Sequence, residues 1–159
     1  MKSRIFPKES SNFKSEFDFN QLIEILKENT LDGSLSSTAY NTSKKFIGSV
    51  EERSFKIISS SNRTSMFCIF EGQLLNESKE ILIIKKFHPT FRNLFIFWAI
   101  AMLSILIFLP GRSNPVVSLI MFFAFVLFLR YLLITVLYRK SLEEGMEKLT
   151  DTLKLTEKC

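Results

Sequence analysis

The sequence predicts an α+β membrane protein. It comprises an N-terminal helix, a four-stranded antiparallel meander, a transmembrane helical hairpin and a cytoplasmic helical extension. Three observations carry this prediction. Residues 94–138 are almost wholly apolar, residues 45–88 hold four short runs that suit strands, and residues 142–153 carry apolar residues at helical spacing. With 159 residues, the chain can form one small domain plus a membrane anchor.

The first expected element is a helix that begins after Asp18. Asp18 suits the N-cap and Gln21 the reciprocal position of a capping box. Apolar residues then share one helical face: Phe19, Leu22, Ile23 and Leu26. Residues 1–17 carry charge but no apolar core, so we expect a flexible N-terminus and no signal peptide there.

Four candidate strands follow, at residues 45–50, 54–59, 66–74 and 80–88. Their separators are of hairpin length, which favours an antiparallel meander. The fourth run is apolar on both faces at residues 81–84. We therefore expect two covers, the N-terminal helix on one face and the chain from residue 132 onward on the other.

Two apolar runs flank the turn-forming residues 110–115 and predict a membrane hairpin at residues 91–138. The first run, residues 94–109, would be about 24 Å long as a helix, slightly short of the ~30 Å bilayer core. Flanking residues extend it, so we place the spans at about 93–110 and 115–132. The turn holds one cation, Arg112, and the other side holds many, so both termini are expected in the cytoplasm. The residues expected at that membrane interface are Lys85, Lys86, Arg92, Trp98, Arg130, Tyr131, Arg139 and Lys140.

Arg130 has two interpretations. An arginine inside a span is by default a functional candidate. If Leu109 lies beside Val116, however, Arg130 falls beside roughly Phe95, where it would snorkel to the headgroups. On this favoured interpretation, residues 132–137 leave the bilayer still apolar and need a protein cover.

The extension at residues 139–159 is expected to be an amphipathic helix with a tail. Its apolar positions Leu142, Met146, Leu149 and Leu153 are spaced four, three and four apart. We favour docking on the chain's own α+β domain, residues 18–90, over a coiled-coil seam.

The stretch Phe46-Ile-Gly48, Asn62-Arg-Thr-Ser65, Phe70-Glu-Gly72 and His88-Pro89, followed by Phe97-Trp98, resembles a family of small uncharacterised bacterial two-helix membrane proteins. The resemblance covers residues 46–98 best. It implies a sheet domain before a helical hairpin and carries no known activity. A looser likeness is to bacterial membrane-anchored pleckstrin-like domains.

Candidate sites are few. His88 is the only histidine, and we expect a polar edge residue there in preference to a general base or metal ligand. Glu71 and Glu80 are expected to pair with lysines across strands, and Cys68 to be a small core residue. No phosphate loop, catalytic triad or metal spacing is present, so we predict no cofactor and no enzyme.

These patterns favour a membrane-anchored, non-catalytic interaction module that presents a sheet domain at the cytoplasmic membrane surface. Its expected partners are the lipid bilayer and either anionic headgroups or a protein, and homo-oligomers stay open. Nucleic acid is not expected, because no aromatic-basic motif accompanies the net charge of +5. The alternative is a small oligomeric membrane effector or pore-forming protein. Ser104, Ser118 and Arg130 are few residues with which to line a pore.

Overall fold

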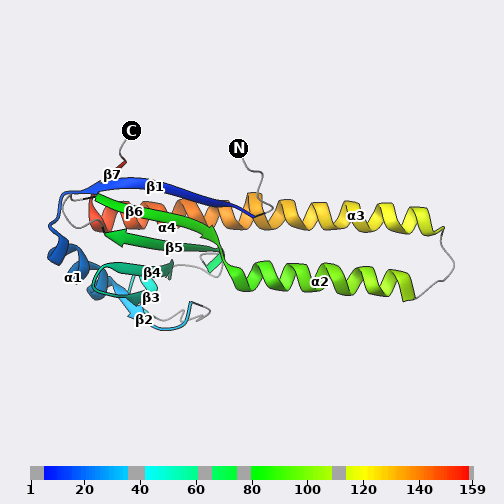
Figure 1. The fold of residues 1–159 in the computed structure, drawn as a ribbon, viewed down its shortest axis with the longest axis horizontal. Helices are drawn as coiled ribbons and strands as arrows, with labels where there is room; N and C mark the ends of the chain where they lie inside the picture. Colours follow the sequence, from blue (N-terminus) through cyan, green and yellow to red (C-terminus); the bar gives the residue numbers. More distant parts are fainter. Residues whose placement is uncertain (1–5, 36–41, 61–65, 75–79, 109–113, 158–159) are drawn as a thin grey trace.

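A computed structural model describes residues 6–35, 42–60, 66–74, 80–108 and 114–157. The fold is α+β, with a mixed seven-stranded sheet and one long apolar helix (Figure 1). In chain order the elements are β1 (Lys8–Ser15), α1 (Phe19–Asn29), β2 (Thr30–Asp32), β3 (Phe46–Val50), β4 (Ser54–Ser59), β5 (Cys68–Leu74), β6 (Glu80–Phe87), α2 (Pro89–Phe108), α3 (Pro115–Tyr131), the π-helix η2 (Leu132–Tyr138), α4 (Arg139–Leu153) and β7 (Leu155–Glu157).

The predicted antiparallel meander is confirmed as β3 to β6, within the sheet order β2-β3-β4-β5-β6-β1-β7. Three further strands were not expected. β2 adds to β3 in parallel, β1 pairs with β6 along its length, and β7 pairs with β1. The prediction of a flexible N-terminus is therefore wrong for Lys8–Ser15. Those residues show little apolar alternation, and the ladder with β6 is what orders them.

The start of α1 is confirmed. The backbone N–H of Asp18 donates to Gln21 Oε1 at 3.3 Å, which is one half of a capping box. Leu22, Ile23 and Leu26 are buried, as their shared helical face predicts.

One main core lies between the sheet and two helices. It joins Leu26 of α1, Leu149 and Leu153 of α4, and sheet residues such as Ile57 and Phe70, each fully buried. The expectation that α1 and α4 cover opposite faces is therefore wrong, because both pack on the same one. The opposite, outer face is strongly apolar at one end only, where Leu31, Leu35 and Met66 pack on a small cluster of Ile47, Ile58 and Ile69.

The docking predicted for the C-terminal stripe is confirmed. Leu149 and Leu153 are buried in the main core, and Leu142 and Met146 pack against it. The tail beyond them continues as β7, so residues on both sides of the expected 18–90 domain complete its sheet.

The chain from α3 through η2 to α4 forms one continuous helical rod (Figure 1). By length and composition, one helix among the described residues qualifies as a membrane span, Val116–Leu153, while Pro89–Ile105 is a shorter apolar helix. The α2 backbone stays helical to Phe108. Both apolar helices project beyond one end of the sheet.

Candidate functional site

The junction where β6 passes into α2 is organised by His88. Its backbone N–H donates to the Phe67 carbonyl at 2.9 Å, and its carbonyl accepts from the Arg92 N–H at 3.1 Å. The imidazole Nδ1 accepts from the Thr90 N–H at 3.2 Å. His88 thus caps the helix that begins at Pro89, and it is buried instead of lying at a polar edge. Burial is the main reason that the pKa of His88 lies below its usual 6.5.

Aromatic rings pack between the sheet and the sheet-proximal end of the helical hairpin. They come from the segment before β1, the residues before β5, the end of β6, the start of α2 and the end of η2. The contacts, with their centroid separations, are Phe67–Phe91 (4.3 Å), Phe6–Phe87 (5.3 Å), Phe87–Tyr138 (5.9 Å) and Phe6–Phe95 (6.1 Å). Large, rigid rings of this kind hold two elements in a defined relation. We call this group the aromatic junction.

A buried polar group lies beside the aromatic junction. The Cys68 N–H donates to Ser141 Oγ at 3.0 Å, which ties β5 to α4. Cys68 is fully buried, as a core cysteine should be, and burial raises the pKa of its thiol to about 12. The pKa of the neighbouring Tyr138 is raised as well, first by burial and then by the proximity of Cys68. Both groups are therefore neutral at physiological pH.

Four of the predicted interface cations lie on the sheet domain and not on the hairpin. On β6, Lys85 Nζ lies 5.8 Å from the Phe13 ring centroid, and Lys86 pairs with Glu71. On α4, Arg139 pairs with Glu143 at 3.5 Å and Lys140 is exposed.

The other two cations, Arg92 and Arg130, lie on the hairpin helices. Trp98 of α2 contacts Phe125 of α3 with ring centroids 5.5 Å apart. In an antiparallel pair that contact places Arg130 opposite residue 93, within two residues of the Phe95 expected. Tyr131, next to Arg130, is exposed.

The segment that follows Arg130 is covered on one side only. Leu133 packs against the main core, whereas Leu132 and Val136 are 37% and 45% exposed. The expectation that residues 132–137 need a protein cover therefore holds for one side of η2. π-helical turns inside longer α-helices are frequent at functional sites.

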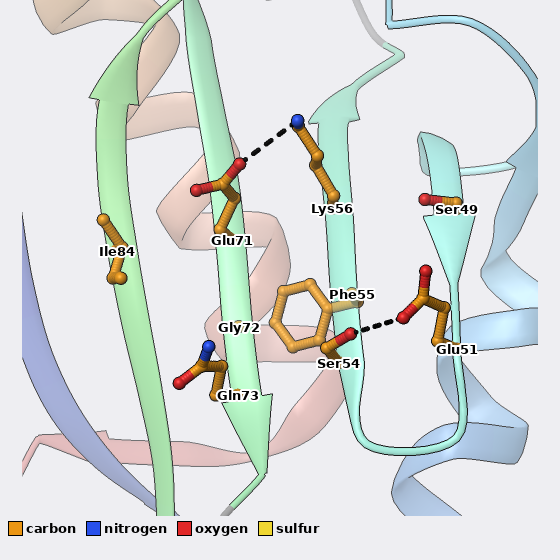
Figure 2. A pocket seen from close by; sticks show the side chains of 9 residues that line it. All are labelled: Ser49, Glu51, Ser54, Phe55, Lys56, Glu71, Gly72, Gln73 and Ile84. Atoms are coloured by element: carbon orange, nitrogen blue, oxygen red, sulfur yellow. Dashed lines mark hydrogen bonds and ion pairs between the residues drawn. The ribbon is translucent and has the colours of Figure 1, made fainter.

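A polar group occupies the middle of the outer face (Figure 2). Glu71 on β5 lies 3.3 Å from Lys56 Nζ of β4, the ion pair drawn in Figure 2. It also lies 2.5 Å from Lys86 Nζ of β6, on the opposite side of β5. Burial raises the pKa of Glu71, but the bonds from the two lysines outweigh it and lower the pKa below 4.5. This confirms the expected cross-strand pairing of Glu71 with lysine. A shallow depression of about 230 Å³ lies beside it, and Ser49, Ser54, Gln73 and Ile84 are among its lining residues.

Among the described residues, no group of three or more His, Cys, Asp and Glu side chains could hold a metal ion. No protein-family model matches the chain, and neither curated proteins nor solved structures give a significant match. The resemblance to two-helix bacterial membrane proteins stays a prediction.

The aromatic junction is the feature that sequence reasoning missed. Phe87, Phe91 and Phe95 stand four apart in the sequence, a spacing that signals one helical face, although Phe87 in fact ends a strand. Nothing near Phe6 in the sequence indicates that it reaches Phe95.

Proposed function

We propose that the protein is a membrane-anchored, non-catalytic interaction module that holds its sheet domain at the cytoplasmic membrane surface. One observation carries this proposal: the two halves of a single continuous helix have opposite environments. In α3, Ile120 and Leu127 are each 62% exposed, whereas Leu149 and Leu153 of α4 are fully buried against the sheet. A large exposed apolar surface on one half needs an apolar solvent, and a bilayer supplies it.

Two spans follow from the proposal if α2 shares the bilayer with α3. The two helices run side by side and touch through Trp98 and Phe125. The part of α2 beyond Arg92, residues 93–108, corresponds to about 24 Å, slightly short of the ~30 Å hydrocarbon core. Arg92 lies on the sheet side of α2 and Arg112 in the loop, outside the described residues, and the excess of cations on the sheet side favours cytoplasmic termini.

The interaction surface that we propose is the outer face of the sheet. Neither α1 nor α4 packs there, since both belong to the core on the other face. We include no catalysis in the proposal because the ionisable side chains of His88 and Glu71 have structural roles. His88 caps α2, and Glu71 is held between two lysines.

Insertion and topology can be tested together in a Cys159→Ser variant. Membranes are washed with alkaline carbonate, and cysteines introduced singly at Ser49 and Ser113 are probed with a membrane-impermeant thiol reagent. We expect the protein to stay with the membrane and the two positions to label from opposite sides. Release by carbonate, or labelling of both positions from one side, would contradict the two-span anchor. Ion flux in vesicles that hold the purified protein would favour the pore-forming alternative.

The interaction is tested by photo-crosslinking in cells from two exposed positions. Ser49 lies at the depression on the outer face, and Glu147 on α4 serves as the matched control. The proposal expects a discrete adduct from position 49 and none from position 147. The same adduct from both positions, or none from either, would count against the outer face as the binding surface.

A further inference from the structure

The charge along the middle of the chain has one sign. Between Glu80 and Glu143 the sequence holds no Asp or Glu, but it holds seven cations. Four of them lie on β6 and α4 and one in the loop. That leaves Arg92 and Arg130 as the two cations on the hairpin helices themselves. The hairpin helices themselves therefore carry positive charge and no carboxylate, which favours an anionic ligand beside them.

The two arginines lie at the same level of the hairpin. Because Trp98 contacts Phe125, each step toward the sheet along α2 matches one step along α3. Arg92 and Arg130 therefore fall within about one helical turn of each other. Both lie at the sheet-proximal end of the hairpin, the end that meets the membrane surface if the helices span it.

The two arginines also lie on the same side of the hairpin. The half-buried residues Phe95 and Trp98 mark the facing line of α2, and Phe122 and Val126 mark that of α3. Viewed from the N-terminus of each helix and at 100° per residue, Arg92 lies about 90° clockwise from its line, and Arg130 lies about 60° clockwise from its own. In antiparallel helices, equal senses of rotation point to the same side of the pair.

Below the arginines, the same side of the hairpin is apolar and exposed. Rotation by the same rule places Ile96 of α2 and Phe123 and Leu127 of α3 there, with exposed fractions of 43%, 55% and 62%. A cationic pair above an exposed apolar surface has the two-part chemistry of a phospholipid, with a phosphate headgroup and acyl chains.

We propose that Arg92 and Arg130 together bind the phosphate of an anionic phospholipid whose acyl chains lie along this side of the hairpin. The proposal rests on the proposed function, since it requires the helices to be in the bilayer. Guanidinium groups suit it because their planar donors match phosphate oxygens with two hydrogen bonds at once. The apolar surface beneath the pair favours a lipid over free phosphate.

The single tryptophan, Trp98, serves as a reporter, since it lies about 9 Å below Arg92 along α2. The full chain is reconstituted in phosphatidylcholine vesicles that contain phosphatidylglycerol. Two vesicle preparations are compared: in one the phosphatidylglycerol carries bromine near the headgroup end of its acyl chains, and in the other the phosphatidylcholine does. The quenching of Trp98 fluorescence in the two preparations gives the ratio of the two lipids beside Trp98. We expect phosphatidylglycerol to be enriched at least about fivefold over bulk, the contribution of one arginine at an anionic surface.

The test variant is the double substitution Arg92→Gln with Arg130→Gln. Its control, Arg139→Gln with Lys140→Gln, removes the same charge from α4, about 13 Å further along the long helix. The proposal expects the enrichment to vanish in the first variant and to persist in the second. Equal enrichment in both variants, or equal loss, would overturn the arginine site in favour of a diffuse charge effect.

Two further measurements, competition by inorganic phosphate and extraction with carbonate, distinguish a lipid ligand from free phosphate and the lipid site from the anchor. Millimolar inorganic phosphate should leave the enrichment unchanged, and competition by it would overturn the lipid as the ligand. Both double variants should resist carbonate extraction, because neither changes the apolar surface. If the parent itself were extracted, the proposed anchor would fail. If only the enrichment were missing, the lipid site would fail while the anchor stood.

Discussion

Gly145 of α4 lies directly against the ring of Phe70 on β5. A Cβ atom added at residue 145 would come within 2.3 Å of Phe70 Cε2 and 2.4 Å of Cζ. Phe70 is fully buried and is paired with Ile57 across the sheet, so its ring has little room to move. This contact sets how closely the long helix approaches the sheet, and with it the position of the hairpin that the helix carries.

Gly145→Ala should therefore destabilise the protein, although alanine is the better helix former by up to about 1 kcal/mol. Forcing a methyl group into a packed core costs typically 1 to 3 kcal/mol. The measurement is thermal unfolding of the full chain in detergent. Gly33→Ala is the matched control, because its nearest neighbour would be 3.9 Å away. Phe70→Leu should partly rescue Gly145→Ala, and a Gly145→Ala protein as stable as the parent would refute the close contact.

The cap at His88 gives the protein a pH dependence that begins as the pH falls below about 6.5, the ordinary pKa of histidine. Because burial depresses the pKa of His88 in the folded state, the unfolded chain takes up its proton first as the pH falls. Stability is thus full above pH 6.5 and declines below it. His88→Asn should keep a cap acceptor and flatten this decline, whereas His88→Ala should lose about 1 kcal/mol at neutral pH. Unfolding curves recorded at several pH values check both, and a parent insensitive to pH in this window would argue against a buried neutral imidazole.

The Cys68 thiol should be inert in the folded protein. With a pKa near 12 and no exposure, it should not react with a water-soluble disulfide reagent at pH 8, and it should react once the chain unfolds. A Cys159→Ser background removes the other cysteine. The raised pKa of Cys68 also predicts that its contribution to folding stability is full below pH 9 and falls as the pH rises toward 12. Cys68→Ala should reduce that alkaline loss, and rapid labelling of the native protein would contradict the burial.

The lowered pKa of Glu71 predicts a separate acid effect. Its ion pairs stabilise the fold above pH 4.5, and this contribution is lost as the pH falls and the carboxylate is protonated. Glu71→Gln should remove that part of the acid transition. Glu51→Gln is the control, since Glu51 is exposed and accepts a hydrogen bond from Ser54 at 3.0 Å. The same acid unfolding profile for Glu71→Gln and the parent would show that the paired lysines contribute nothing measurable.

Several features could be predicted from the sequence because they depend on residues close together in the chain. The capping pair Asp18 and Gln21 is separated by one helical turn, and the strands of the meander follow one another through short turns. The apolar stripe ending at Leu153 likewise indicated a helix that docks on a sheet. Composition alone revealed the long apolar helix.

The site was predicted in part. Arg130 was placed near the start of the first apolar helix by counting residues from the turn, and Trp98 with Phe125 supports that register. The rotation that brings Arg92 and Arg130 to one side of the hairpin needs the facing lines of both helices. His88 was expected at an edge, because burial of a polar side chain depends on what packs over it.

The sequence by itself determined the local elements and the apolar hairpin, since periodicity and capping act over a few residues. The tertiary structure decided which strands complete the sheet and which face the helices cover. The hydroxyl of Ser15 donates to the carbonyl of Leu153 at 2.7 Å across 138 positions of the chain. Contacts of that separation leave no local pattern, because each partner becomes favourable only after the whole sheet and the long helix have come together.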